Sequence, residues 1–346
     1  MANIFESIHR LFSQDMGIDL GTANTLVCIQ GEGIILSEPS VVAVSKYTNE
    51  VFNNAVGEVA KVMLGKCPAN IMAVRPLKHG VIADFAVTEA MLKYFIKKAQ
   101  RRKFATKPRV VISIPSGITS VEKQAVIDSA LRAGALQVFL IEEPIAAGLG
   151  AGLPITEPYG SMIVDIGGGT TEVAVLSLGG CVASESVRVA GDDLDNAIVQ
   201  YIKKTYNLLI GEQTAERIKK EIGSAYELEE ELTLEIHGRD LQAMLPRSTE
   251  VHSEEIRQAL IEPVSQILQA IKATLEKVPP QLAADLVDQG ITLAGGGALL
   301  RGLDRMIQRE TDLCVRVAPE PLYSVARGTL EVLNQLELLL PVLCSG

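Results

Sequence analysis

Asp19-Leu-Gly-Thr-Ala-Asn-Thr-Leu-Val27 aligns without gaps on Asp165-Ile-Gly-Gly-Gly-Thr-Thr-Glu-Val173. In each copy an apolar run ends on an aspartate, a turn containing glycine follows, and small hydroxyl or amide residues begin a second run. Such a pattern predicts a strand, a tight turn and a returning strand. We call the turns that begin at Gly21 and Gly167 the first and second glycine turns. One structural unit therefore occurs twice in this chain.

The segments around the two copies also repeat one order of strands and helices. Before residue 150, apolar periodicity predicts strands at 18–20, 25–30, 33–36, 41–44, 110–114 and 138–141 and helices at 56–64, 87–99 and 121–133. After a glycine-rich linker at 148–154 it predicts strands at 162–165, 172–178 and 182–189 and helices at 194–205 and 215–225. Strands that alternate with helices indicate an α/β fold.

A third glycine turn, within Leu293-Ala-Gly-Gly-Gly-Ala-Leu-Leu300, follows a predicted strand at 291–293 and opens a predicted helix that ends near Arg309. Glycine turns after strands expose backbone N–H groups to an anion at close range. Aspartates beside them suit Mg²⁺, which is held by one or two carboxylates together with phosphate oxygens. One such turn alone is explained by a tight hairpin with a solvated aspartate, but two matched copies favour a nucleotide phosphate site.

Length and composition limit the classes of protein to which this chain can belong. The 346 residues exceed one ordinary core and predict either two domains or one elaborated α/β unit. A net charge of −10 argues against nucleic acid as the main partner, although it leaves room for a local basic patch. Aromatic residues, at 4% with no tryptophan, leave little from which to build a base-stacking surface. The five cysteines and four histidines show neither disulfide nor metal-ligand spacing. The sequence contains neither a P-loop nor a Gly-x-Gly-x-x-Gly fingerprint, so P-loop and Rossmann proteins lose support.

Four short motifs resemble those of the actin, Hsp70 and sugar-kinase ATPase superfamily. They are the phosphate motifs Asp19-Leu-Gly-Thr22 and Asp165-Ile-Gly-Gly-Gly-Thr170, the connecting motif Glu142-Glu-Pro-Ile-Ala-Ala147 and the adenosine motif Ala294-Gly-Gly-Gly-Ala298. Longer stretches at 17–27, 75–85, 161–175 and 216–225 resemble the MreB family of bacterial actins, which maintain rod shape. The likeness extends from near residue 1 to about residue 340.

The resemblance implies an actin-like fold of the α/β class, in which two duplicated α/β domains surround a nucleotide cleft that holds ATP and Mg²⁺. Each domain would carry a smaller inserted subdomain. Domain I would comprise residues 15–150, with an insertion at about 37–74, and would be completed by a C-terminal helix at about 321–346. Domain II would comprise residues 151–320, with an insertion at about 186–246.

The resemblance also assigns roles to individual residues, position by position. Asp19 and Asp165 would lie near the metal, and Glu143 with Thr170 would position the attacking water. A helix-start carboxylate stabilised by the macrodipole also explains Glu143. Gly148 departs from the family, which more usually has alanine there, and glycine inside a helix costs roughly 1 kcal/mol. The phosphate-binding residues would be Thr22, Ala23, Asn24, Gly167, Gly168 and Gly169, and the adenosine-binding residues Glu216, Arg217, Ile218, Lys219, Gly296, Gly297, Ala298 and Leu299.

The start of the chain predicts an amphipathic N-terminal segment at 1–14. Its apolar residues, at spacings that place them on one side of a helix, are Ile4, Phe5, Ile8, Leu11 and Phe12. Such a helix can dock on the fold or bind a membrane interface weakly, and many copies in a filament would strengthen that binding. A basic cluster at 97–109, which includes Phe104, suits an anionic lipid surface, although cations at a helix end also complement its dipole. The resemblance favours the membrane.

The expected function is that of an ATP-binding, slowly ATP-hydrolysing bacterial actin that forms membrane-associated filaments and organises cell-wall synthesis. The resemblance implies paired protofilaments of the chain itself, partners such as MreC, MreD and RodZ, and a cytoplasmic location at the inner membrane face. The helix that begins near Thr119 is the candidate lateral contact. A small-molecule kinase on the same fold is the alternative, but no catalytic aspartate base is identifiable. A chaperone ATPase would need a peptide-binding domain after the last nucleotide turn, where little chain remains.

Overall fold

The structure is a computed structural model that describes residues 14–100, 107–340 and 343. Contacts within the chain define two compact units. The first unit continues past residue 150, the predicted end of domain I, and includes residues 176–182, which fall within the predicted domain II. The first unit comprises Met1–Tyr159, Leu176–Val182 and Leu322–Gly346, and the second comprises Gly160–Val175 and Ala183–Pro321.

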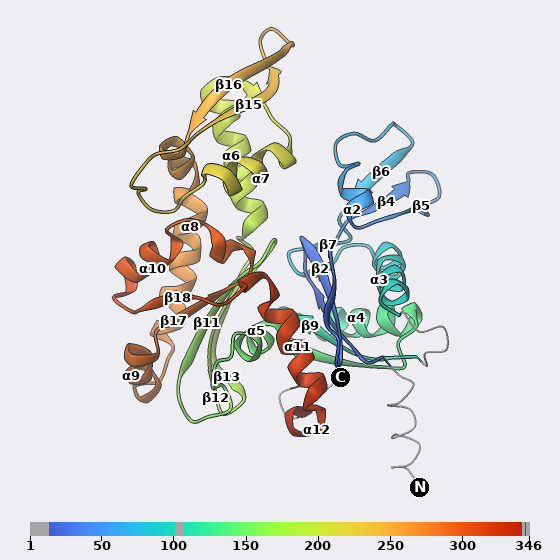
Figure 1. Ribbon diagram of the computed structural model, residues 1–346, viewed down its shortest axis with the longest axis vertical. Coiled ribbons are helices and arrows are strands. Elements are labelled where there is room, and N and C mark those ends of the chain that lie inside the picture. The colour runs from blue at the N-terminus through green and yellow to red at the C-terminus, as the bar shows by residue number, and fades with distance from the viewer. Residues whose placement is uncertain (1–13, 101–106, 341–342, 344–346) are drawn as a thin grey trace. The chain divides into compact units, whose positions relative to one another are not determined.

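A five-stranded sheet forms the centre of the first unit (Figure 1). Its strands are β1 (Met16–Leu20), β2 (Asn24–Ile29), β3 (Gly33–Pro39), β9 (Arg109–Ile114) and β10 (Gln137–Glu142). They lie in the order β10-β9-β1-β2-β3, in which β1 is antiparallel to β2 and parallel to β9. The strands predicted for this part of the chain are confirmed, with their ends shifted slightly.

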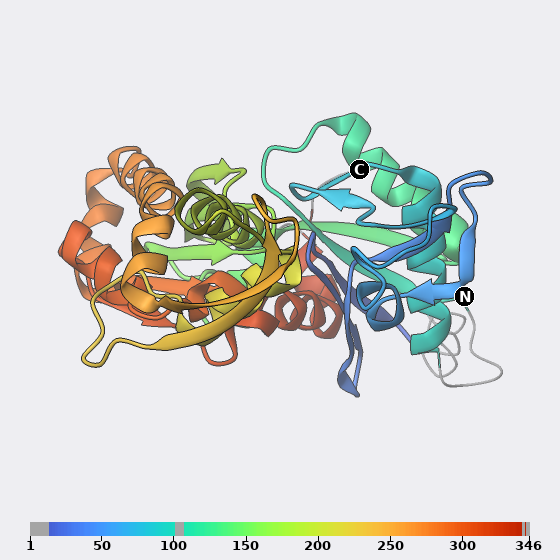
Figure 2. The ribbon, with the colours of Figure 1, turned by 90° about the horizontal axis from the view of Figure 1, so that it is seen from above.

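Helices cover both faces of this sheet because successive strand residues point to opposite sides. Met16 and Ile18 of β1 belong to one hydrophobic core with Phe95, whereas Gly17 between them faces Thr329. Phe95 lies on α3 and Thr329 on α11. α3 and α4 pack side by side (Figure 2). The helices of this unit are α3 (Phe85–Ala99), α4 (Ser120–Ala133), α5 (Glu143–Gly150), α11 (Ser324–Asn334) and α12 (Leu336–Leu339).

The predicted insertion at 37–74 contains a small three-stranded sheet, and a short hairpin follows it. The helix predicted at 56–64 is wrong over most of that range, because residue 56 ends a strand and the helix after it has only four residues. Gly57 separates the two with φ +70°, a left-handed conformation that glycine adopts without strain. The elements are β4 (Val42–Ser45), β5 (Val51–Val56), α2 (Glu58–Lys61) and β6 (Ile71–Val74), then the hairpin of β7 (Leu77–Lys78) and β8 (Val81–Ile82).

The second unit is also built on a five-stranded sheet with helices packed on it. Its strands are β11 (Ser161–Ile166), β12 (Thr171–Ser177), β13 (Gly180–Val187), β17 (Ile291–Ala294) and β18 (Val315–Val317), in the order β13-β12-β11-β17-β18. Its helices are α6 (Gly191–Tyr206), α7 (Glu212–Ile222), α8 (Ser253–Glu276), α9 (Pro280–Gln289) and α10 (Leu303–Thr311), with the 3₁₀ turn η1 (Gly296–Leu299). A second 3₁₀ turn, η2 (Pro321–Tyr323), spans the boundary at which the chain returns to the first unit. Val164 and Ile166 of β11 share one core with Leu194 of α6 and Ile218 of α7. A smaller sheet contains β14 (Leu208–Leu209), β15 (Thr233–Asp240) and β16 (Pro246–His252).

Two predicted boundaries differ from the structure for steric reasons. The linker predicted at 148–154 begins inside α5, which ends at Gly150. A Cβ at Gly150 would overlap the carbonyl oxygen of Ser324 on α11, so glycine lets the two helices pass closely and the helix continues. The helix predicted after the third glycine turn is divided into η1 and α10, because Gly302 between them has φ +71°.

Candidate nucleotide site

The first glycine turn connects β1 to β2 in the first unit. A Cβ at Gly21 would lie 2.6 Å from the carbonyl oxygen of Asn24, so the turn requires glycine there. Ser40, just after β3, supports the turn. Its Oγ donates a hydrogen bond of 2.6 Å to the carbonyl oxygen of Gly21, and its N–H donates one of 2.9 Å to that of Ala23. Sequence reasoning missed Ser40. Only the register of β2 with β3, in which Asn24 pairs with Pro39, shows that Ser40 lies beside this turn.

Two predicted site residues of the first unit bind groups from other elements. The Oγ of Ser113 on β9 donates a hydrogen bond of 3.1 Å to Oδ1 of Asp19. The N–H of Gly80, between β7 and β8, donates one of 2.9 Å to Oγ1 of Thr22. Burial raises the pKa of Asp19 to about 7, against the lowering effect of the hydrogen bond from Ser113. A cation beside Asp19 would therefore stabilise a carboxylate that burial alone disfavours.

Glu143 is the first residue of α5 and is only 8% exposed. Pro144 follows it, at a helix start where a missing N–H costs nothing. The neighbouring carboxylate of Glu142 accepts a hydrogen bond of 3.4 Å from Oγ of Ser116, so the two adjacent acids have different surroundings. An acid in the first helical turn is favoured by the macrodipole. The position of Glu143 therefore agrees with stabilisation of the helix start as well as with a role in positioning the attacking water.

The second glycine turn connects β11 to β12 in the second unit. The N–H of Gly167 donates to the carbonyl oxygen of Thr170 at 2.9 Å, which closes the turn. The start of α6 also binds the turn, because Gly191 N–H donates to the carbonyl oxygen of Gly167 at 3.1 Å. Asp192 N–H donates to that of Gly168 at 2.8 Å. Backbone hydrogen bonds to a helix start thus anchor this turn.

The third glycine turn lies directly beside the second. β11 and β17 pair in parallel, with Asp165 opposite Ala294. A Cβ at Gly295, where φ is +76°, would lie 2.5 Å from Oδ1 of Asp165, which is itself buried. The structure therefore brings the predicted metal residue Asp165 together with the turn that carries Gly296, Gly297, Ala298 and Leu299.

Lys219 of α7 is joined to the start of α6. Its Nζ donates a hydrogen bond of 2.7 Å to the carbonyl oxygen of Gly191 and forms an ion pair of 2.8 Å with Oδ1 of Asp195. Burial raises the pKa of Asp195 to about 6, against the lowering effect of the Lys219 charge. Since Gly191 also binds the second glycine turn, Lys219 is connected to that turn through one residue.

Other predicted residues of α7 have different surroundings. Arg217 donates a hydrogen bond of 3.2 Å to the carbonyl oxygen of Glu235 on β15, and Ile218 is fully buried in the core. Glu216 accepts one of 2.5 Å from Nζ of Lys220 on the same helix. The structure thus connects Lys219 to the glycine turns, whereas the side chains of Arg217 and Ile218 are directed to β15 and to the core.

Comparison with known proteins relates this arrangement to one family. A family model described as MreB/Mbl protein matches residues 13–340. The chain belongs to the MreB/Mbl family. It is 53% identical over 331 residues to the cell shape-determining protein MreB of Escherichia coli strain K12, with 95% of each chain covered.

Solved structures of related proteins establish the fold. The crystal structure of MreB5 of Spiroplasma citri bound to AMPPNP matches with a TM-score of 0.89 and 38% identity, over 94% of this chain and 97% of that one. The MamK double helical filament matches with a TM-score of 0.78 and 22% identity, over 93% of this chain and 99% of that one. The predicted actin-like fold and the predicted family are both confirmed.

In this member of the MreB/Mbl family the residues fit a nucleotide accompanied by Mg²⁺. Within the described residues, no group of three or more His, Cys, Asp or Glu side chains could hold a metal ion. Mg²⁺ at a nucleotide needs no such group, because phosphate oxygens and waters supply most of its ligands. Asp19 precedes a turn in which a Cβ at Gly21 would lie 2.6 Å from the carbonyl oxygen of Asn24. Asp165 lies beside a turn in which a Cβ at Gly295 would lie 2.5 Å from Oδ1 of this aspartate. Single carboxylates beside such turns are the donor set that Mg²⁺ with phosphate requires.

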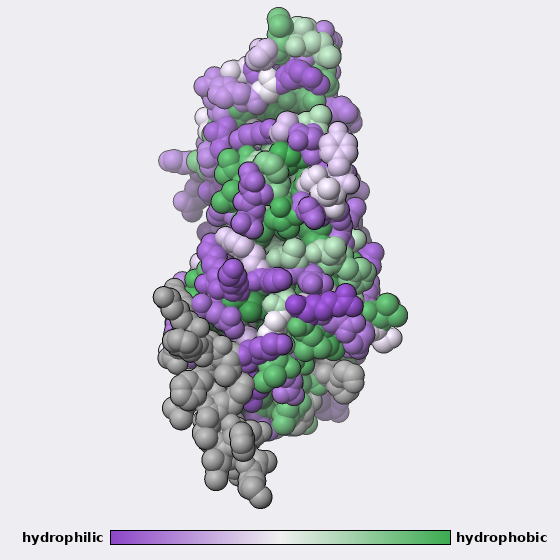
Figure 3. Space-filling model, turned by 90° about the vertical axis from the view of Figure 1, so that its right-hand side faces the viewer, coloured by the Kyte–Doolittle hydropathy of each residue, from purple (hydrophilic) through white to green (hydrophobic). Residues whose placement is uncertain are grey.

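The residues predicted to bind membrane, Ile4, Phe5, Ile8, Leu11, Phe12 and Phe104, lie outside the part of the chain that the structure describes. In the basic cluster, Lys98 pairs with Glu38 and Arg109 pairs with Asp15 at 2.6 Å, so these two charges have partners in the first unit. Among residues 14–100 and 107–340, no helix is long and apolar enough to cross a membrane. On the face shown in Figure 3, hydrophobic side chains are scattered among hydrophilic ones.

The predicted helix near Thr119 begins there, as α4. Oγ1 of Thr119 accepts a hydrogen bond of 3.2 Å from the N–H of Glu122, whose carboxylate accepts one of 2.8 Å from the N–H of Thr119. This reciprocal capping fixes the helix start. Val121 in the first turn of α4 is 75% exposed. An exposed apolar residue on a capped helix suits the predicted lateral contact, which stays a prediction.

Proposed function

We propose that this chain is an ATP-binding, slowly ATP-hydrolysing filament protein that acts in determining cell shape. The observation that carries the proposal is the repeated design of the site. In each unit a buried strand delivers an aspartate, Asp19 or Asp165, beside a turn that contains glycine. A Cβ would not fit at Gly21 in the first unit or at Gly295 in the second. The relative in Escherichia coli is named for determining cell shape, and that of Spiroplasma citri has been solved with AMPPNP and with ADP.

The glycine turns would bind the phosphates. In such turns backbone N–H groups can approach phosphate oxygens closely. The phosphate-binding residues would be Thr22, Ala23 and Asn24 in the first glycine turn and Gly167, Gly168 and Gly169 in the second. Asp19 and Asp165 would hold Mg²⁺. When bound, Mg²⁺ would neutralise negative charge on the phosphate oxygens. Glu216 and Lys219 of α7, with Gly296–Leu299, would hold the adenosine end.

Glu143 and Thr170 would act on the attacking water. The Glu143 carboxylate can accept a hydrogen bond from that water and orient it, and the Thr170 hydroxyl can hold it from another direction. Orientation of one water by one carboxylate gives modest acceleration compared with the full set of groups in fast phosphoryl-transfer enzymes. Slow hydrolysis suits a filament in which the bound nucleotide marks the age of each subunit.

In the cell, these filaments would lie at the inner face of the cytoplasmic membrane and organise cell-wall synthesis. The N-terminal segment at 1–14 and Phe104 would bind the lipid surface, and many subunits would together bind more strongly than one. Paired protofilaments would meet through α4, where Val121 is exposed. Partners of the cell-wall elongation machinery, such as MreC, MreD and RodZ, would connect the filament to wall synthesis.

Negative-stain electron microscopy of the purified chain with Mg-ATP and anionic liposomes tests this proposal, beside a chain that lacks residues 1–13. We expect filaments on lipid for the full chain, and filaments detached from lipid for the shorter one. Absence of filaments at every concentration, together with rapid ATP turnover on addition of a small alcohol or sugar, would overturn the proposal in favour of a small-molecule kinase.

A further inference from the structure

We propose that Arg257 and Arg301 form an arginine clasp that fixes the spacing between α7 and η1 and thereby sets the affinity for the adenosine part of the nucleotide. The inference rests on the proposed function, which places adenosine between these two elements. Neither arginine belongs to the motifs that the sequence analysis singled out. Both act as positioning residues, through backbone segments that they hold.

Arg301 connects the third glycine turn to the end of α7. Its guanidinium NH1 donates hydrogen bonds of 2.9 Å to the carbonyl oxygen of Lys220 and of 3.3 Å to that of Gly223. Its own carbonyl oxygen accepts one of 2.8 Å from the N–H of Ala225. The last carbonyls of a helix lack intrahelical partners and carry partial negative charge, so a cation is favoured there. Arg301 thus joins η1, two residues before it, to the helix that carries Lys219.

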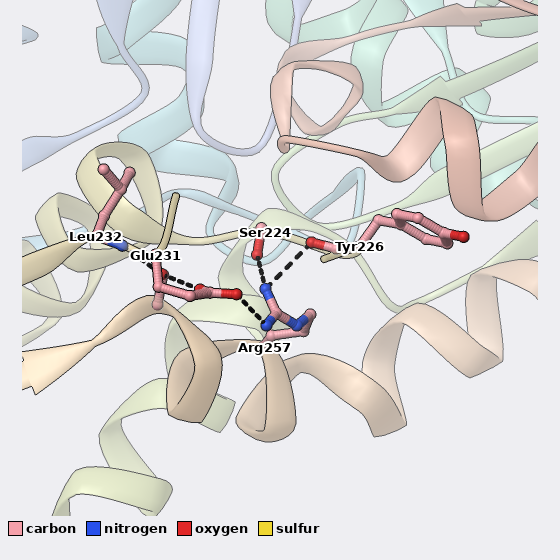
Figure 4. Close-up of polar contacts among 6 residues, drawn as sticks. Ser224, Tyr226, Glu231, Leu232 and Arg257 are labelled. Atoms are coloured by element: carbon pink, nitrogen blue, oxygen red, sulfur yellow. Dashed lines mark hydrogen bonds and ion pairs between the residues drawn. The ribbon is translucent and has the colours of Figure 1, made fainter. Parts of the chain in front are cut away.

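Arg257 of α8 also holds this segment, through Ser224 and Tyr226 (Figure 4). Its NH1 donates hydrogen bonds of 3.0 Å to Oγ of Ser224 and of 3.2 Å to the carbonyl oxygen of Tyr226. Its NH2 binds Oε1 of Glu231 at 2.6 Å, and Glu231 also accepts a hydrogen bond from Ser253. The hydrogen bond from Arg257 lowers the pKa of Glu231, which keeps the pair charged.

Steric contact makes the junction tight. Gly302, which follows Arg301, has φ +71°, and a Cβ there would lie 2.6 Å from Cβ of Tyr226. Ser224 is fully buried, and the Arg257 side chain is 16% exposed. Residues 224–226 are therefore held by Arg257, paired with Arg301 and packed against Gly302. η1 cannot move away from α7 without breaking the charge-assisted hydrogen bonds of Arg301, which are stronger than neutral ones, and Arg257 fixes the segment that pairs with Arg301.

The phosphate turn has its own supports, which the clasp does not share. The second glycine turn is closed by the hydrogen bond from Gly167 N–H to Thr170 and is bound by the start of α6. Loosening the clasp would therefore widen the α7–η1 spacing by releasing η1, while Lys219 keeps α7 joined to Gly191 and the second glycine turn stays in place. Affinity for adenosine and affinity for triphosphate would respond differently, which a general loss of folding would not produce.

Titration calorimetry on the full chain, below the concentration at which filaments form, tests the clasp with Mg-ATP and Mg-tripolyphosphate as ligands. For Arg301→Gln and Arg257→Gln we expect ATP affinity to fall about tenfold, while tripolyphosphate affinity stays within about twofold. Arg301→Lys, which keeps a cation at the end of α7, is expected to lie between Arg301→Gln and the unaltered chain. Arg305→Gln on α10, an exposed arginine outside the clasp, serves as the matched control.

The outcomes separate the clasp from a purely structural role. Equal loss of ATP and tripolyphosphate affinity, or a lower melting temperature with ATP affinity unchanged, would overturn the inference. Glu231→Gln leaves the hydrogen bonds of Arg257 to Ser224 and Tyr226 in place and is expected to fold, so a smaller loss of ATP affinity than in Arg257→Gln supports the clasp. An unaltered chain that binds no ATP would overturn the proposed function itself, whereas normal ATP binding by every variant would overturn only the clasp.

Discussion

The backbone N–H of Gly80 donates a hydrogen bond of 2.9 Å to Oγ1 of Thr22. This bond connects the hairpin of β7 and β8 to the first glycine turn within the first unit. A hydroxyl that accepts from one side can still donate its own proton on another. Thr22 can therefore hold the hairpin and bind a phosphate oxygen at the same time, so the hairpin is coupled to whatever occupies the turn.

Replacement of the Thr22 hydroxyl should weaken both the fold and nucleotide binding. Thr22→Val keeps the shape of the side chain but leaves the N–H of Gly80 without its acceptor, which we expect to cost about 1 kcal/mol of unfolding free energy. ATP affinity should fall as well. Urea unfolding and ATP titration measure the two effects, and Thr22→Ser, which keeps the hydroxyl, is the control. Equal ATP affinity for the Val and Ser variants would contradict a role for this hydroxyl in phosphate binding.

Two glycines of α5 should tolerate the same substitution to very different extents. A Cβ at Gly150 would overlap the Ser324 carbonyl and lie 2.7 Å from the N of Gly328 on α11, whereas one at Gly148 meets only side-chain methyl groups of Leu176 and Ile155. Gly150→Ala should cost more than about 3 kcal/mol, because backbone cannot move aside as methyl groups can. Gly148→Ala should stay within about 1 kcal/mol, since the helix propensity of alanine offsets the repacking.

Urea unfolding of the two variants, with their midpoints compared at a common slope of unfolding free energy against urea concentration, tests both expectations. Comparable midpoints for the two variants would show that α5 and α11 can separate without cost. The result also bears on Gly148, a position at which the resemblance led us to expect alanine. If alanine is tolerated there, the methyl groups of Leu176 and Ile155 can move aside, and neither packing nor backbone freedom requires glycine at this position.

The repeated turn could be predicted from the sequence because its determinants are local. An apolar run that ends on Asp19 or Asp165, followed by glycine, specifies a strand, a turn and a returning strand within one short segment. The matching of two copies then indicated a shared ligand. Periodicity likewise predicted α3, α4, α6 and α7, whose apolar residues recur at helical spacing.

The supports of the site could not be predicted, because they come from residues that the fold brings together over long distances in the chain. Arg301 binds the carbonyl of Lys220, 81 residues away, and Arg257 binds Ser224, 33 residues away. No local pattern distinguishes these arginines from solvated ones. The helix expected at 56–64 failed for a related reason, since apolar spacing does not reveal that Gly57 adopts a positive φ.

Asp195 should make stability depend on pH in a direction opposite to that of most carboxylates. Burial raises its pKa to about 6, so the folded chain binds this proton more tightly than the unfolded chain does. The stabilising contribution is present at low pH and is lost as pH rises through about 6. Between pH 5 and 7.5 we expect the unfolding free energy to lose roughly 1 kcal/mol from this residue.

The variant Asp195→Asn isolates this contribution, because asparagine resembles the protonated acid and does not titrate. The difference in unfolding free energy between the variant and the unaltered chain should shift in favour of the variant as pH rises from 5 to 7.5. Asp288→Asn, an exposed acid on α9, controls for a general charge effect. A difference that stays constant across this pH range would show that Asp195 is charged throughout and is fully compensated by Lys219.

The two adjacent acids at the start of α5 should differ in their effect on hydrolysis. Glu143 is buried and is proposed to orient the attacking water, while Glu142 accepts a hydrogen bond from Ser116. Glu143→Gln keeps the size of the side chain but removes the charge that accepts a proton, so we expect the ATPase rate to fall about 100-fold or more. ATP affinity should change by less than about threefold, because the phosphate turns are untouched.

Glu142→Gln is the matched control, since it makes the same chemical change one residue away and keeps an oxygen that can accept from Ser116. Its ATPase rate should stay within about threefold of the unaltered chain. Single-turnover phosphate release, measured at saturating Mg-ATP, separates the chemical step from binding. If both variants slow equally, the helix start acts through its total negative charge, and Glu143 has no special role in placing the water. If only Glu143→Gln slows, its carboxylate is the group that orients the water.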